Sequence, residues 1–401
     1  MKKALLLLLS IGSLTLSAQN ISDNKVNFKY IQLPSHPVDP AFSTYQVILN
    51  RSYELANEDS LNVFALHQDA ANIDYWAQLA SWREQKKVID RHYLNELAAW
   101  EKASYTGGAT TKPQRQPYPP QPVMEEVEEP LLHDDLADAY VGSKVNVHGF
   151  TVGAGGVVIT IDMGPISEMK ITKKRSGSGA STKYEYQCTY KLVSTLKVDC
   201  PSRGTVYNTM LGNSTKTHKM KSYSSQYEFD LWWLDNKQTF WTELQTKARN
   251  SMLGEINITL NNTIGFPEKT RSTEVYSVKK FKDHSYTDLT EAYTIAKQGY
   301  VQIKDDRNRS GAADKLQDAI SAWEAVLSES NPSDKNSRIN QKVTAMIYYN
   351  LAEAYLWTSD FDKAEQYIDK AINGGSMKFK NAAKGLQAFL KERKKRWQAN
   401  Y

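Results

Sequence analysis

The chain has 401 residues, and its 50 lysine and arginine side chains outnumber its 45 aspartate and glutamate side chains by only five. So small a net charge creates no overall field that would attract a nucleic acid, and we expect no nucleic-acid partner. The hydrophobic fraction of 40% allows sizeable buried cores, and the length suggests two or three domains.

The N-terminal end has the pattern of a secretory signal peptide. Lys2 and Lys3 precede the apolar run 4–9, and the small residues Ser17 and Ala18 stand before the expected cleavage point. The run is too short to span a bilayer, and no later stretch approaches the roughly 20 apolar residues that a span requires. No cysteine follows the run, so a lipid anchor is not expected. We predict a mature chain without a transmembrane segment, exported to the periplasm or associated with the outer membrane.

Two strands and a long helix are predicted next, and together they form an N-terminal region over 19–105. β-Branched and aromatic residues dominate 25–33 and 44–53, and prolines between them indicate a stiff loop. From about Leu61 to Ser104, large apolar residues recur every three, four or seven positions without proline. This spacing predicts an amphipathic helix or a pair of helices.

Residues 106–130 differ from both neighbours in composition. They hold six of the chain's 13 prolines and end in a cluster of glutamates, which indicates an exposed linker or an extended arm. Residues 131–285 then predict a β-rich α+β domain, with a short helix over 131–140 and a longer one over 237–252. The strands predicted in this domain cover 144–152, 157–163, 167–174, 184–198, 223–231 and 255–260.

The only two cysteines lie in this β-rich domain. Export would place Cys188 and Cys200 in an oxidising compartment, where a disulfide is the natural expectation. Such a bond would close a short loop and stabilise the fold by roughly 2–3 kcal/mol. The alternative is a pair of unpaired thiols in separate strands.

The tryptophans of the same domain offer a second interpretation of its function. Trp232, Trp233 and Trp241 lie close together in the sequence and would suit an aromatic platform for the sugar rings of a glycan. Core packing is the stronger alternative, because alternation and helical spacing assign most of these aromatic residues an inward face.

The segment from Ala345 to Ser376 has the most specific pattern in the chain. Its sequence, AMIYYNLAEAYLWTSDFDKAEQYIDKAINGGS, places alanine at the eighth, twentieth and twenty-seventh positions and large apolar residues at the fourth, seventh and eleventh. Small residues at these positions let two antiparallel helices approach closely, while the larger ones fill the space between them. The pattern resembles the tetratricopeptide repeat (TPR). A weaker helical pair over 286–328 and a capping helix over 380–397 would supply the neighbours that one repeat needs.

Tetratricopeptide repeats bind extended peptides or partner helices on the concave face of their first helices. The resemblance implies that the face consists here of Met346, Tyr349, Asn350, Glu353 and Trp357, with Lys380 and Lys384 from the next helix. Asn350, Lys380 and Lys384 also match part of the clamp that some family members use for a C-terminal carboxylate. Thr294 and Gln298 replace its other half, and the alternative for the lysines is a solvated capping helix.

We therefore expect an α+β protein with a β-rich middle domain, a C-terminal α-helical TPR-like module over 286–401 and a long N-terminal helix. The leading hypothesis is a non-enzymatic exported adapter or scaffold that binds an envelope protein or peptide through this module. Glycan or envelope-polymer binding by the middle domain is the alternative, and a hydrolase with scattered catalytic residues is the third. No spacing indicates a metal site or a cofactor. The expected start of the mature chain at Gln19 and its high tyrosine content are similar to those of exported Bacteroidota proteins.

Overall fold

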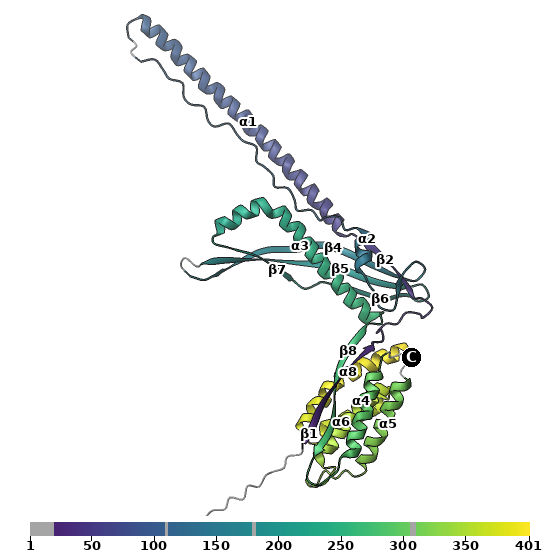
Figure 1. Ribbon diagram of the computed structural model, residues 1–401. Helices are drawn as coiled ribbons and strands as arrows, with labels where there is room; N and C mark the ends of the chain where they lie inside the picture. Colours follow the sequence, from purple (N-terminus) through teal and green to yellow (C-terminus); the bar gives the residue numbers. More distant parts are fainter. Residues whose placement is uncertain (1–19, 109–110, 179–181, 305–309) are drawn as a thin grey trace, which may run out of the picture.

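The computed structural model describes residues 20–108, 111–178, 182–304 and 310–401; the predicted signal peptide lies outside these ranges. The chain forms an α+β fold with a β-rich body, a helical module at the C-terminal end and one long helix that projects from the body (Figure 1). The fold class expected from the sequence is confirmed. Within the described ranges, no helix combines the length and the apolar character needed to cross a membrane.

The body is built around a sheet with the strand order β3-β2-β4-β5-β6, in which β7 also pairs with β5. Strand β2 runs parallel to β3 and β4, and the other pairs are antiparallel. Along β5 buried residues alternate with more exposed ones, as expected for a sheet with one covered face. The strands are β2 (Thr44–Asn50), β3 (Thr151–Val152), β4 (Val157–Ser176), β5 (Lys183–Cys200), β6 (Gly204–Leu211) and β7 (Lys216–Tyr223).

A single helix, α3 (Gln226–Thr263), covers the buried face of this sheet (Figure 1). The prediction of a strand at 255–260 is wrong, because these residues belong to α3. Ile256 and Leu260 lie about one helical turn apart, and both are fully buried. The β-branched residues beside them are typical of a strand, but the packing of α3 against the sheet stabilises the helix. The strand predicted at 223–231 is also wrong beyond its first residue, since the Ser225 hydroxyl caps α3 by accepting from a backbone N–H.

The short helix of this region begins later than predicted. Helix α2 covers Asp138–Lys144, whereas 131–137 is not helical. Of the strand predicted over 144–152, only the last two residues are a strand, as β3.

Helix α1 (Tyr53–Tyr105) is one continuous helix of 53 residues, about 80 Å long at 1.5 Å per residue. It leaves the body at its N-terminal end, and the segment that follows it runs back along its length (Figure 1). The Trp82 indole N–H donates to the Pro119 carbonyl at 2.8 Å. The predicted linker is therefore an extended strap, described over 111–130, that covers one face of α1.

In the part of the chain that the structure describes, the C-terminal module consists of five helices and a two-stranded ribbon. Strands β1 and β8 of the ribbon pair antiparallel along their whole length and pack against the helices. Because β1 precedes α1 and β8 follows α3, the core of this module crosses the boundaries predicted at residues 105 and 285. The elements are β1 (Asn20–Ile31), β8 (Glu268–Lys280), α4 (Thr287–Gln302), α5 (Ser310–Leu327), α6 (Gln341–Thr358), α7 (Phe361–Asn373) and α8 (Met377–Asn400).

Two turn glycines of the body differ in the space around them. Gly212, between β6 and β7, has φ +73°, and a Cβ there would lie 2.0 Å from the Leu192 carbonyl oxygen. Gly204 has φ +70° with nothing within 4 Å of such a Cβ. In urea unfolding, we expect Gly212→Ala to lower the free energy of unfolding by about 3 kcal/mol, and Gly204→Ala by about 1 kcal/mol. Equal losses for the two variants would contradict this account.

Candidate functional site

The concave side of the helical module is the site that the sequence predicts for a partner, and the chain's own β1–β8 ribbon fills it. The inner residues of α6 that were predicted to bind a peptide are all buried: Met346 0%, Tyr349 7%, Asn350 1%, Glu353 1% and Trp357 1% exposed. The prediction of an open concave face is therefore wrong. No external peptide can reach these side chains while the ribbon stays in place.

Asn350 holds the backbone of strand β8. Its side-chain Nδ2 donates to the Tyr276 carbonyl at 2.8 Å, and its Oδ1 accepts from the Tyr276 N–H at 3.0 Å. The amide thus forms hydrogen bonds with both backbone polar groups of one residue on a buried face, where such groups require partners. Because the contact is made to the backbone alone, it suits any extended segment, and here that segment belongs to the same chain.

One turn further along α6, Glu353 holds β8 through an ion pair. The two carboxylate oxygens accept from Nε and Nη2 of Arg271, each at 3.0 Å. Trp357 adds a third donor, its indole N–H at 3.1 Å. The Arg271 guanidinium also lies 3.8 Å from the centre of the Phe389 ring. A planar, two-pronged contact of this kind fixes both the position and the register of the strand.

Strand β1 packs on the same face of the module through its aromatic side chains. The Phe28 ring stacks on Tyr300 with the ring centres 5.6 Å apart and meets the edge of Trp357 at 5.0 Å. Burial raises the pKa of the Tyr300 hydroxyl well above its usual range, as it does for Tyr349. Both phenols therefore stay neutral and act as packing groups.

The two lysines predicted for a carboxylate clamp do not complete one. Lys384 is exposed and lines an outer groove with Glu365 of α7 and Lys391 of α8. Lys380 is half-buried, and the Asn350 amide that would have to join them is already bonded to Tyr276.

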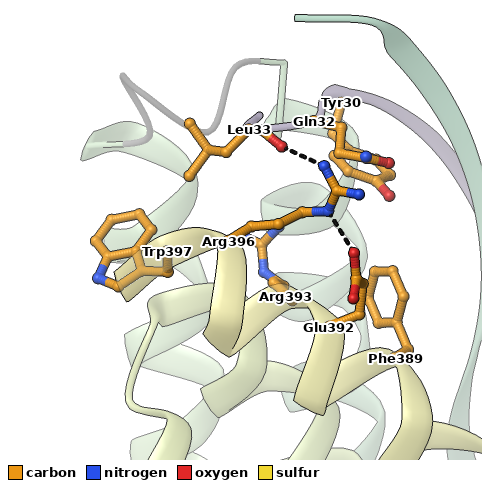
Figure 2. A pocket seen from close by; sticks show the side chains of 8 residues that line it. All are labelled: Tyr30, Gln32, Leu33, Phe389, Glu392, Arg393, Arg396 and Trp397. Atoms are coloured by element: carbon orange, nitrogen blue, oxygen red, sulfur yellow. Dashed lines mark hydrogen bonds and ion pairs between the residues drawn. The ribbon is translucent and has the colours of Figure 1, made fainter. Parts of the chain in front are cut away.

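A joint between the module and the body lies at the end of the ribbon (Figure 2). Arg396 of α8 donates from Nη1 to the carbonyls of Leu33 and Asn262, both at 2.8 Å, and from Nε to Glu392 at 2.8 Å. The cavity beside it has a volume of about 30 Å³, which is the space of roughly one water molecule. This corner ties α8 to the end of α3 and is too small for a substrate.

The three tryptophans proposed as a glycan platform do not form one. Trp241 is 3% exposed, and its indole N–H donates to the Leu132 carbonyl at 2.5 Å. Trp232 and Trp233 are half-buried and pack with Phe229 in an aromatic cluster under the sheet. The platform prediction is wrong for Trp241, because that ring belongs to the core.

The predicted disulfide is also wrong. Cys188 and Cys200 are both free and both buried, and they lie on the same unbroken strand, β5. Twelve residues of strand separate them by about 40 Å, whereas a disulfide requires Cα atoms about 4–7 Å apart. Burial raises the pKa of the Cys188 thiol to about 11, so it stays protonated.

His133 lies where α1, β4 and α3 meet. Its backbone N–H and ring Nδ1 lie 2.7 and 3.1 Å from the Asn57 side-chain oxygen, and its Nε2 accepts from the Ile166 N–H at 2.9 Å. Burial is the main cause that lowers the pKa of His133 to about 4, and the charge of Arg249 adds to it. The neutral ring therefore acts as a structural link.

The low pKa of His133 predicts a loss of stability in acid. A histidine that is neutral in the folded chain binds a proton more readily after unfolding. Its contribution to the free energy of unfolding is therefore complete above pH 6.5 and is lost as the pH falls towards about 4. We expect this loss to be about 1–2 kcal/mol after allowance for partial exposure. Denaturation midpoints across that range should show a smaller loss for His133→Gln and an unchanged loss for the exposed His67→Gln. Parallel curves for all three chains would contradict the assignment.

Comparison with known proteins returned no matching family model, no matching curated protein and no matching solved structure. Among the described residues, no three histidine, cysteine, aspartate or glutamate side chains gather closely enough to hold a metal ion.

Proposed function

We propose that this chain is a non-enzymatic, exported scaffold protein of the cell envelope that docks a protein partner through the projecting helix α1. The observation that carries the proposal is the exposure of large apolar side chains on this helix: Leu55 68%, Leu66 67%, Ile73 73% and Trp76 60%. Single exposed apolar residues are ordinary, but a row of them along one helix indicates a contact surface. Because α1 stands away from the body (Figure 1), a second chain is needed to cover that row.

In this proposal the C-terminal helices are a TPR-like module that uses its peptide-binding mode within its own chain. The support is chemical: Asn350 pairs with the backbone of an extended strand, and Glu353 fixes an arginine of that strand. The module then serves as an anchor for both ends of the body, while docking takes place on α1. Such a division suits a scaffold, in which a rigid part positions a projecting contact surface.

Site-specific photo-crosslinking in native envelope fractions tests the docking surface. A photoreactive residue in place of Ile73 should capture a protein, whereas one in place of Gln85, which is exposed elsewhere on α1, should not. Addition of Trp76→Glu to the Ile73 probe should abolish capture, because a charge would enter the apolar contact.

Two results would contradict the proposal. Equal capture from positions 73 and 85 would mean that α1 has no specific contact surface. Capture from a probe at Lys384 of α8 alone would place docking on the outside of the helical module.

A further inference from the structure

Helix α1 has two faces of different kinds. One face is covered by the strap: Tyr118 donates to Asp90 at 2.6 Å, Trp82 donates to Pro119, and Leu79 is only 6% exposed. The covered positions recur at intervals of three, four or seven residues from Tyr53 to Trp100, as expected for one side of a helix. The opposite side has no cover within the described chain.

The uncovered side carries a seam of apolar residues at coiled-coil spacing. Intervals of three, four and seven residues connect the central members, and the seam extends over about 60 Å at 1.5 Å per residue. Its apolar members, each exposed, are Leu55, Leu66, Ile73, Trp76, Ala80 and Leu94.

The positions on this seam are symmetric about the point between residues 74 and 75. In an antiparallel pair of identical helices, residue i of one chain lies opposite residue j of the other when i and j have a constant sum. With a sum of 149, Leu55 lies opposite Leu94 and Ile73 lies opposite Trp76. The apolar residues at the ends and at the centre therefore meet in the same register.

The charges on the seam distinguish the two directions of pairing. Its first half carries Glu58 and Asp69, and its second half carries Arg83, Lys87 and Arg91. A parallel pair would place each of these opposite its own copy, which gives five contacts between like charges. The antiparallel register places Glu58 opposite Arg91, and it brings Asp69 within one turn of Arg83. Opposite charges at these spacings are favourable, and like charges are not.

We propose that the occupant of this seam is a second copy of the chain, paired antiparallel along α1 in the register that sets Leu55 against Leu94. The inference rests on the proposed function, in which α1 is the docking surface, and it names the partner. The two bodies then lie at opposite ends of the helix pair, and the strap of each chain stays on the outer side. A standard interface draws about 20–30 residues from each partner, a number that a seam of this length and its flanking residues approach.

The mass of the purified mature chain tests self-association. Light scattering at micromolar concentration should give twice the chain mass. Ile73→Glu with Trp76→Glu should give the mass of one chain and weaken the dimer about a hundredfold or more, because these two positions lie opposite each other and four carboxylates would meet at the centre of the seam. The matched control, Ser81→Glu with Gln85→Glu, adds the same charge at exposed positions off the seam and should remain a dimer. A single mass for the unmodified chain at every concentration overturns the inference.

Cysteine crosslinking tests the direction and the register. When a Leu55→Cys chain is mixed with a differently tagged Leu94→Cys chain, oxidation should link the two tags, and neither chain alone should form a disulfide. Both native cysteines are buried and should not compete. Disulfides within the Leu55→Cys chain alone would show parallel pairing and overturn the proposed register.

The two proposals fail in different ways. If the purified chain is monomeric while the Ile73 probe still captures an envelope protein of another mass, α1 remains a docking surface and the second copy is excluded. If the chain is monomeric and the probe captures nothing, both proposals are wrong.

Discussion

Replacement of Asn350 by leucine is expected to destabilise the helical module by about 3 kcal/mol and to loosen strand β8. The side chain is 1% exposed, and its amide is bonded to both the N–H and the carbonyl of Tyr276. Leucine fills a similar volume but removes these two buried hydrogen bonds, at a cost of about 1–3 kcal/mol each before relaxation. Urea unfolding measures the total loss.

Hydrogen exchange shows whether that loss lies in the ribbon. The Tyr276 amide should exchange much faster in Asn350→Leu, whereas amides in the central sheet should keep their protection. Asn381→Leu on α8 is the matched control, since Asn381 is exposed and its replacement should change stability by less than about 0.5 kcal/mol. Unchanged protection of Tyr276 in Asn350→Leu would show that this amide does not hold the strand.

The helices of the C-terminal module were the part of the structure that the sequence predicted best. The spacing of small and large residues after Ala345 identified α6 and α7, and the resemblance to the tetratricopeptide repeat implied that Asn350 and Glu353 belong to the inner face, where they lie. Such patterns are local, because neighbouring turns of a helix are only three or four residues apart in the sequence.

The occupant of that inner face could not be predicted in the same way. Strands β1 and β8 pair across roughly 240 residues, and nothing in either strand distinguishes a partner in the ribbon from a partner in the central sheet. The disulfide prediction was wrong for a different reason, because it did not take account of the single strand predicted over 184–198. In the structure that strand, β5, is 18 residues long and ends at Cys200, well above the usual length of 5–6, so it holds the two cysteines far apart.

The long helix was predicted from its covered face alone. Tyr75, Trp82, Tyr93 and Trp100 supplied the three- and four-residue spacing, and the strap from the proline-rich segment packs on that side. The opposite seam has alanine and charged residues among its apolar positions, so it has a weaker sequence pattern. It becomes visible only when the structure shows which side of α1 is uncovered.

Replacement of Glu353 by alanine is expected to be the most destabilising change in the module, at about 3–5 kcal/mol. The carboxylate is 1% exposed on its side chain, and its partner Arg271 is 19% exposed. Removal of one member of a buried pair leaves the other charge in a site with little water. The Trp357 indole N–H loses its acceptor in the same variant. Thermal or urea unfolding should show the loss.

A second ion pair on the same ribbon provides the control. Lys29 of β1 and Glu268 of β8 lie 2.7 Å apart, but their side chains are 66% and 59% exposed. Glu268→Ala should therefore cost less than about 1 kcal/mol. Replacement of both Arg271 and Glu353 by methionine should recover most of the stability lost in Glu353→Ala, because no unpaired charge remains. If the double variant is as unstable as the single one, the ion pair itself, and not the avoidance of a lone buried charge, holds β8 on the module.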